Sequence, residues 1–342
     1  MRHDIFPKNS GPLADPRWGN VVTRRKRGKI YLVARLLYRS DGPVRTVQLR
    51  ERVSESFIIR NVTSGLKQLF GSKSTTLALL FILFLFVIGI FAPNLAPYDP
   101  AVTHYNADGE VLRATGPSVA HPLGTTSLGY DVLSRMIIGS QATLLTGFLG
   151  GTMIVTIGLT VGVTAGYLGG TVDTVLMRFT DIVYTIPLLI FGIVLLAYVD
   201  PSLFTTILVI GSILWRSSAR VLRSQVLQIK QRPYIEAAKA TGASTPRIII
   251  KHILPNIAPL GALFFALGAG WAILLQAGLA FVGVTDPFVP SWGIMIRNAY
   301  NSGYMADQLA WTFAPGIMIS FTVASLFLVG RKLGGENTEP FE

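Results

Sequence analysis

One segment of the chain, Tyr234–Asn256, arranges acidic, small and basic residues in an order that suits force transmission between proteins. Glu236 stands near the start of a helix-forming run and is followed by two alanines. The run breaks at Gly242 and resumes as a basic amphipathic stretch, which predicts a helix, a turn and a second helix. An ordinary solvated loop explains the charges but not this order. We expect the first helix to fit a groove on a soluble partner.

Residues that form enzyme or metal sites are scattered or missing. The chain has no cysteine, and its four histidines lack metal-ligand spacing. No G-x-x-x-x-G-K-[ST] phosphate loop occurs, so any ATP hydrolysis needs another chain. We therefore expect no catalytic residue, no metal and no cofactor in this chain.

The elements that carry these residues are apolar enough for lipid. Half of the 342 residues are hydrophobic and 14% are charged, against about a quarter charged in soluble domains. A helix needs roughly 20 mostly apolar residues to cross a bilayer. Six apolar runs occur; five of them meet that length, and the fourth along the chain is shorter. The six lie near 75–95, 144–167, 182–198, 203–215, 259–282 and 309–330. We expect an all-α membrane protein with about six transmembrane helices in a domain 71–342.

Basic residues orient these spans. Sixteen of the 30 Lys and Arg precede the first span, eight lie between Arg216 and Lys251, and six lie elsewhere. The positive-inside rule places both basic regions in the cytoplasm, which requires 203–215 to be a true span. We expect a multi-pass protein of the plasma or inner membrane with both termini cytoplasmic. The net charge of +12 also suits nucleic-acid binding, but no base-reading motif accompanies it, so we expect no nucleic-acid partner.

The first 70 residues form a basic cytoplasmic extension. It contains a basic run, 24–29, and two weakly amphipathic stretches near Ile30–Leu37 and Phe57–Phe70. These stretches suit interfacial helices on an anionic lipid face. A solvated tail is the alternative for the first half.

Two features of the spans bear on mechanism. Glycines recur in the second span at Gly147, Gly151, Gly158, Gly162 and Gly166, which predicts close helix packing, either within this chain, which we favour, or with a partner subunit. The central stretches of the spans contain no ionisable residue. This argues against an ion-coupled carrier, because such carriers use ionisable residues at membrane depth for the ion pathway.

The segment Tyr234–Asn256 resembles the Glu-Ala-Ala loop of binding-protein-dependent ABC importers. The residues on that pattern are Glu236, Ala237, Ala238, Gly242, Leu254 and Pro255. His252 replaces a commonly hydrophobic residue, yet the run His252–Asn256 is similar to that of the peptide-importer branch.

Further matches over about 121–330 resemble the second, C-type permease subunit of dipeptide and oligopeptide transporters. They are His121–Thr125, Gly129–Arg135, Ala165–Gly170, Met177-Arg178, Asp181, Ile186-Pro187 and Pro290–Gly293. The chain departs from the pattern at Thr126, Tyr130 and Gln276, and in the tail after Gly330.

The resemblance implies a type I ABC importer permease fold that pairs with a homologous permease subunit in the lipid bilayer. Two cytoplasmic ATPase subunits would bind ATP and Mg²⁺, and an extracellular solute-binding protein would deliver di- or oligopeptides. It assigns ATPase coupling to Glu236, Ala237, Ala238, Gly242, Ala243, Ser244 and Arg247. It assigns binding-protein contact or outer-gate closure to Pro290, Ser291, Trp292 and Gly293. Oligosaccharide or nickel cargo, an ion-coupled carrier and a structural membrane protein remain the alternatives.

Overall fold

The computed structural model describes residues 18–26, 29–36, 70 and 72–334, which belong to two compact units, Met1–Val62 and Thr63–Glu342. In the first unit, β1 (Trp18–Lys26) and β2 (Lys29–Leu36) form an antiparallel pair in which Val22 lies opposite Val33. The prediction of an interfacial helix near Ile30–Leu37 is therefore wrong. That stretch is rich in Ile, Tyr, Val and Leu, which favour strands when a partner strand is adjacent. The second predicted stretch, apart from Phe70, lies outside the described residues.

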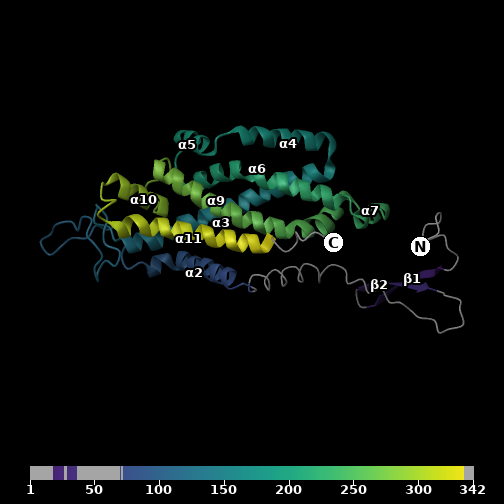
Figure 1. Cartoon of the computed structure of the whole chain (residues 1–342), viewed down its shortest axis with the longest axis horizontal. Coiled ribbons are helices and arrows are strands. Elements are labelled where there is room, and N and C mark those ends of the chain that lie inside the picture. Colours follow the sequence, from purple (N-terminus) through teal and green to yellow (C-terminus); the bar gives the residue numbers. More distant parts are fainter. Residues whose placement is uncertain (1–17, 27–28, 37–69, 71, 335–342) are drawn as a thin grey trace, which may run out of the picture. The chain divides into compact units, whose positions relative to one another are not determined.

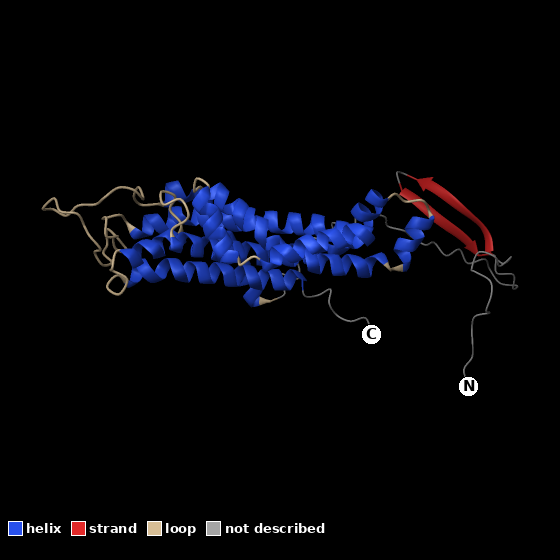
Figure 2. Cartoon of the chain, turned by 90° about the horizontal axis from the view of Figure 1, so that it is seen from above, coloured by secondary structure: helices blue, strands red, loops and turns tan. Residues whose placement is uncertain are grey.

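The second unit is a bundle of long helices that run back and forth along one direction (Figures 1 and 2). Its long elements are α2 (Lys73–Leu95), α3 (Val132–Leu168), α4 (Gly170–Thr185) with α5 (Leu188–Tyr198), α6 (Leu203–Lys230), α9 (Leu254–Val282) and α11 (Leu309–Gly334). Short helices α7 (Pro233–Ala240) and α8 (Thr245–Ile248) and the π-helix η1 (Ile249–Ile253) connect α6 to α9. Helix α10 (Trp292–Asn301) and the 96–131 loop lie at the end of the bundle opposite α7 (Figure 1).

All regular elements described in this unit are helical, which confirms the all-α membrane fold. By length and composition α2, α3, α9 with its preceding turns, and α11 can each cross a membrane, and the pair α4–α5 makes a fifth candidate. That pair is bent by 86°, so the predicted single span at 182–198 is wrong in detail. The bend follows from Pro187, which lacks an N–H and disfavours a helical conformation in the residue before it.

Helix α6 differs most from its predicted length. The short run 203–215 is only the first half of a helix of 28 residues. Its second half carries Arg216, Arg220 and Arg223, which lower its hydropathy, and α6 is not among the helices that pass as spans by composition. Even so, α6 runs along the bundle like its neighbours (Figure 1).

The glycines of α3 pack against helices of the same chain. A Cβ on Gly151 would lie 2.9 Å from the carbonyl oxygen of Phe265 on α9, and one on Gly162 would lie 2.6 Å from that of Ala219 on α6. The prediction of close packing within the chain is confirmed. Helix α3 is thus the central helix, in contact with both α6 and α9.

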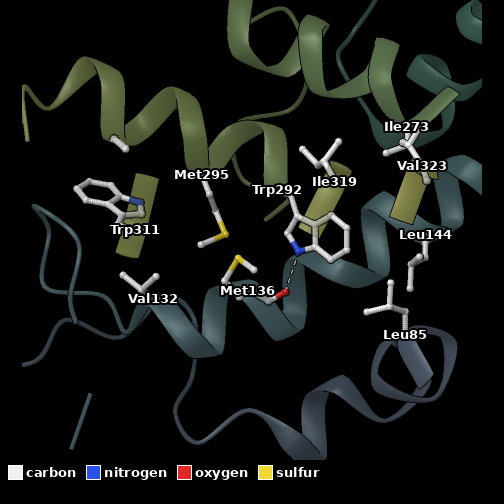
Figure 3. Close-up of a cluster of buried hydrophobic side chains, with 11 residues drawn as sticks. Leu85, Val132, Met136, Leu144, Ile273, Trp292, Met295, Trp311, Ile319 and Val323 are labelled. Carbon is white, nitrogen blue, oxygen red and sulfur yellow. Dashed lines mark hydrogen bonds between the residues drawn. The ribbon is translucent and has the colours of Figure 1, made fainter. Parts of the chain in front are cut away.

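An apolar core near α10 contains residues from five helices (Figure 3). Trp292 on α10 and Trp311 on α11 are each only 1% exposed. The indole Nε1–H of Trp292 donates a 3.0 Å hydrogen bond to the main-chain oxygen of Met136 on α3. Buried indoles need such a partner, and here the bond fixes the start of α10 against α3.

Candidate functional site

The predicted helix, turn and helix are present between α6 and α9. Helix α7 begins with Pro233 in its first turn and carries Glu236 there, where a negative charge favours the helix dipole. Gly242 has φ +79° and ends the helix. Its N–H donates to the Lys239 oxygen (2.9 Å), and the N–H of Ala243 donates to the Ala238 oxygen (3.0 Å). This pair of bonds is a Schellman motif, which favours glycine at the left-handed position.

The two faces of this segment have different surroundings. Five of the seven predicted coupling residues are exposed, and they are Glu236, Ala237, Gly242, Ser244 and Arg247. Ala238 and Ala243 are half-buried and pack against an apolar cluster of α3, α6 and α9 residues. In the same cluster Ile235 and Ile248 are almost fully buried. The segment therefore presents a polar surface and is anchored from beneath by two isoleucines.

A π-helical turn joins this segment to α9. The N–H of Leu254 bonds to the oxygen of Ile249, five residues back. Pro255 follows at once and has no N–H to donate, and its ring would clash with the oxygen four residues back in a regular helix. A wider turn relieves that clash. Thr245–Val282 is consequently one continuous helical stretch of 38 residues.

Lysines also tie the segment to α3. The Nζ atoms of Lys230 on α6 and Lys239 on α7 lie 5.7 Å and 6.0 Å from the centroid of the Tyr167 ring. Both distances are within the range of cation–π attraction. Tyr167 on α3 thus contacts lysines of both α6 and α7, and the sequence did not predict these contacts.

At the opposite end, Ser291 caps α10. Its hydroxyl accepts hydrogen bonds from Ile294 N–H and, at 3.1 Å, from the side-chain amide of Gln276 on α9. Gly293 packs so closely that a Cβ there would lie 2.7 Å from Ala277 Cα. Sequence reasoning placed these residues in a loop and missed α10, since the helix depends on burial of Trp292 against α3.

Ser291, Trp292 and Gly293 are all buried in this structure. Their assignment to binding-protein contact or outer-gate closure stays a prediction. Pro290 is half-buried. In the preceding loop, the Phe288 side chain is 90% exposed.

The 96–131 loop meets α3 through a cluster of rings and a buried carboxylate. His121 Nδ1 lies 2.9 Å from Asp131 Oδ1, and Asp131 Oδ2 accepts the N–H of Ser134 at the start of α3. The ring centroids of Tyr98, His104 and His121 lie 4.6–5.1 Å apart. Burial lowers the pKa of His104, His121 lowers it further, and Asp131 opposes both.

This cluster was not predicted, although His121 and Asp131 both lie in the matched runs. Among the described residues no three His, Cys, Asp or Glu side chains gather closely enough to hold a metal ion. Through the His121–Asp131 contact and the bond to Ser134, the cluster connects the loop to α3.

The described helices thus form an apolar bundle with an exposed, anchored helical segment at one end. The chain belongs to the family of binding-protein-dependent transport system inner membrane components, which matches residues 158–333. Residues 64–117 match the N-terminal TM domain of oligopeptide transport permease C. The resemblance drawn from the sequence motifs is confirmed, and the family places the chain in the inner membrane as a non-catalytic permease.

Named relatives agree with this assignment. The probable D,D-dipeptide transport system permease protein DdpC of Escherichia coli (strain K12) is 36% identical over 261 residues, or 76% of this chain and 85% of the relative. The glutathione transport system permease protein GsiD of Pectobacterium atrosepticum is 32% identical over 74% and 83% of the two chains. The oligopeptide permease OppC of Haemophilus influenzae is 32% identical over 68% and 74%.

Among solved structures, the inward-facing MetNI methionine ABC transporter matches with a TM-score of 0.49 and 20% identity. The match covers 60% of this chain and 97% of the other.

Proposed function

We propose that this chain is one of two related permease subunits of an ATP-driven importer that takes up di- or oligopeptides delivered by an extracellular solute-binding protein. Two cytoplasmic ATPase subunits bind ATP and Mg²⁺ and hydrolyse the ATP. The observation that carries the proposal is the exposed Glu236–Arg247 surface, anchored by Ile235 and Ile248 and continuous with α9. The named dipeptide, glutathione and oligopeptide relatives support peptides as cargo.

The geometry gives the coupling a route. ATP-driven closure of the ATPases pushes on α7 and α8, and the buried isoleucines carry this displacement into α3, α6 and α9. ATP must favour one arrangement through contacts that differ between the two states, since equal binding to both shifts nothing. The basic region Arg216–Lys251, which includes the second half of α6, lies toward the cytoplasmic side in this arrangement, as do both termini.

The test uses the complete complex in proteoliposomes. Glu236→Arg reverses the charge on the exposed surface of α7, and Gly242→Asp strains the left-handed turn. We expect both variants to insert normally, to lose most transport and to uncouple ATPase activity from cargo. Asp307→Arg makes the same kind of charge reversal at an exposed residue of the opposite end and should leave transport intact. Unchanged transport in the Glu236 and Gly242 variants, at normal subunit levels, contradicts the proposal.

The identity of the cargo is tested by binding measurements on the solute-binding protein. Titration of the solute-binding protein with dipeptides, oligopeptides, oligosaccharides and nickel should give binding to peptides alone. Transport by the purified permease without ATPases would instead identify an ion-coupled carrier.

A further inference from the structure

Two buried polar side chains near α10 have an atom that forms no hydrogen bond within the described part of the chain. Gln276 on α9 is 3% exposed and Thr285 is 6% exposed. The Gln276 amide nitrogen donates to Ser291, but neither Gln276 Oε1 nor Thr285 Oγ1 has a partner among the described residues. An unpaired buried polar atom is costly, because burial removes its bonds to water.

Both residues line the same small cavity, together with Thr206, Asp286 and Ser291. The cavity has about 10 Å³ open to the centre of a water molecule, close to the minimum needed to hold one. Its walls come from α3, α6, α9 and α10 and from the loop before α10. The lining is largely apolar apart from a few polar side chains that include Gln276 and Thr285, and a cavity of this size holds at most one water molecule.

The cavity also lies next to a source of water. Thr285 lines a second, open cleft of about 390 Å³ between the α5–α6 turn and the start of the α9–α10 loop. Tyr198 and Asp200 line that cleft and are exposed. Thr285 therefore lines both the small cavity and the open cleft.

We propose that a single water molecule occupies this cavity and bridges Gln276 Oε1 to Thr285 Oγ1. The water donates one hydrogen to the amide oxygen and bonds the threonine hydroxyl with its other hydrogen or its oxygen. Together with the direct bond from Gln276 to Ser291, it fastens both ends of the α9–α10 loop to α9. As part of an outer gate, which rests on the proposed function, this joint must open whenever the loop leaves α9.

The test compares thermal stability of the complete complex for Gln276→Met, Thr285→Val and the double variant. Each single change removes the same bridge, so the double variant should melt about where the less stable single variant does. Thr206→Val is the matched control. Its hydroxyl faces the same cavity but already bonds the Ser202 oxygen at 2.8 Å, so its effect should add to that of Gln276→Met.

A high-resolution map of the complex should show one density peak within hydrogen-bond distance of both atoms. Strictly additive melting shifts for Gln276 and Thr285, or no such peak, would overturn the proposal. A melting temperature that rises with Na⁺ or K⁺, compared with choline at equal ionic strength, would assign the cavity to a cation and overturn it also. None of these measurements requires transport, so their failure is distinct from failure of the importer assignment.

Discussion

The guanidinium of Arg216 on α6 donates a 2.9 Å hydrogen bond to the main-chain oxygen of Val183, near the end of α4. Its Cζ lies 4.9 Å from the Tyr184 ring centroid. A cationic side chain at a helix C-terminus stabilises the last carbonyls and the negative end of the dipole. Because Pro187 cannot continue the α4 hydrogen-bond ladder, Arg216 supplies a donor where the α4–α5 pair bends.

Replacing Arg216 should loosen this bend. Arg216→Met keeps the length of the side chain but removes its charge and donors, and we expect a loss of about 1.5–3 kcal/mol, typical of hydrogen bonds to charged groups. Arg216→Lys should recover part of it, since it keeps the charge without the guanidinium fork. Thermal inactivation of the complex measures both, and equal stability of Met and wild-type proteins contradicts the assignment.

Glycine in α3 is required for space. Gly162→Ala places a methyl group 2.6 Å from the Ala219 oxygen, and we expect a loss of about 1–3 kcal/mol from overpacking. Gly316→Ala on α11 meets nothing within 4 Å and should be neutral or stabilise by about 0.5–1 kcal/mol. Melting temperatures of the two variants give the comparison, and a stable Gly162 variant would show that α3 and α6 can separate without cost.

The 96–131 loop should weaken in acid. The pKa of His104 is lower in the folded protein than its ordinary value of 6.5, so the unfolded chain takes up this proton more readily. Stability is therefore lost as the pH falls below about 6.5 and is regained above it. Limited proteolysis of the 96–131 loop at pH 7.5 and 5.5 should show faster cleavage in acid.

His104→Gln should reduce that difference, while His252→Gln, in η1, serves as the control. A pH dependence that survives unchanged in His104→Gln would place the sensitive group elsewhere.

Cysteine labelling distinguishes the exposed and buried parts of the loop before α10. The chain has no native cysteine. Phe288→Cys, at a 90% exposed position, should react rapidly with a membrane-impermeant maleimide added from outside. Ser291→Cys, three residues later and buried, should react at least tenfold more slowly, in line with its burial. Labelling of Phe288→Cys only from the cytoplasmic side would reverse the topology.

Hydropathy located most of the helices but not their bounds. Helix α3 begins at Val132, well before the apolar run at 144, because its first turns contain polar residues with specific partners. Arg135 bonds the Pro100 oxygen at 3.0 Å and Gln141 bonds the Gly89 oxygen at 2.9 Å. Helix α6 continues past 215 for a similar reason, since Arg223 forms a bidentate ion pair with Asp173 on α4. Such pairings depend on residues distant in sequence, and no local pattern contains them.

The candidate sites also contain features that local sequence determines and features that depend on distant residues. The order Glu, Ala, Ala and Gly predicted the helix and turn around Gly242, because helix formers and a left-handed glycine act locally. Burial of Trp292 and Gly293 required α3 and α9 to be in place, so a four-residue motif could not show it. The β1–β2 pair was missed because an amphipathic stretch of eight residues suits either a strand or a helix.

The helical stretch from Thr245 to Val282 joins α8, η1 and α9 and is long enough to cross a bilayer. At about 1.5 Å per residue, 38 residues extend about 57 Å. Arg247 stands at one tip and Gln276 lies near the other, on the same rod. Under the proposed function, a tilt imposed at Arg247 would move Gln276 with it, because both residues lie on one helical stretch.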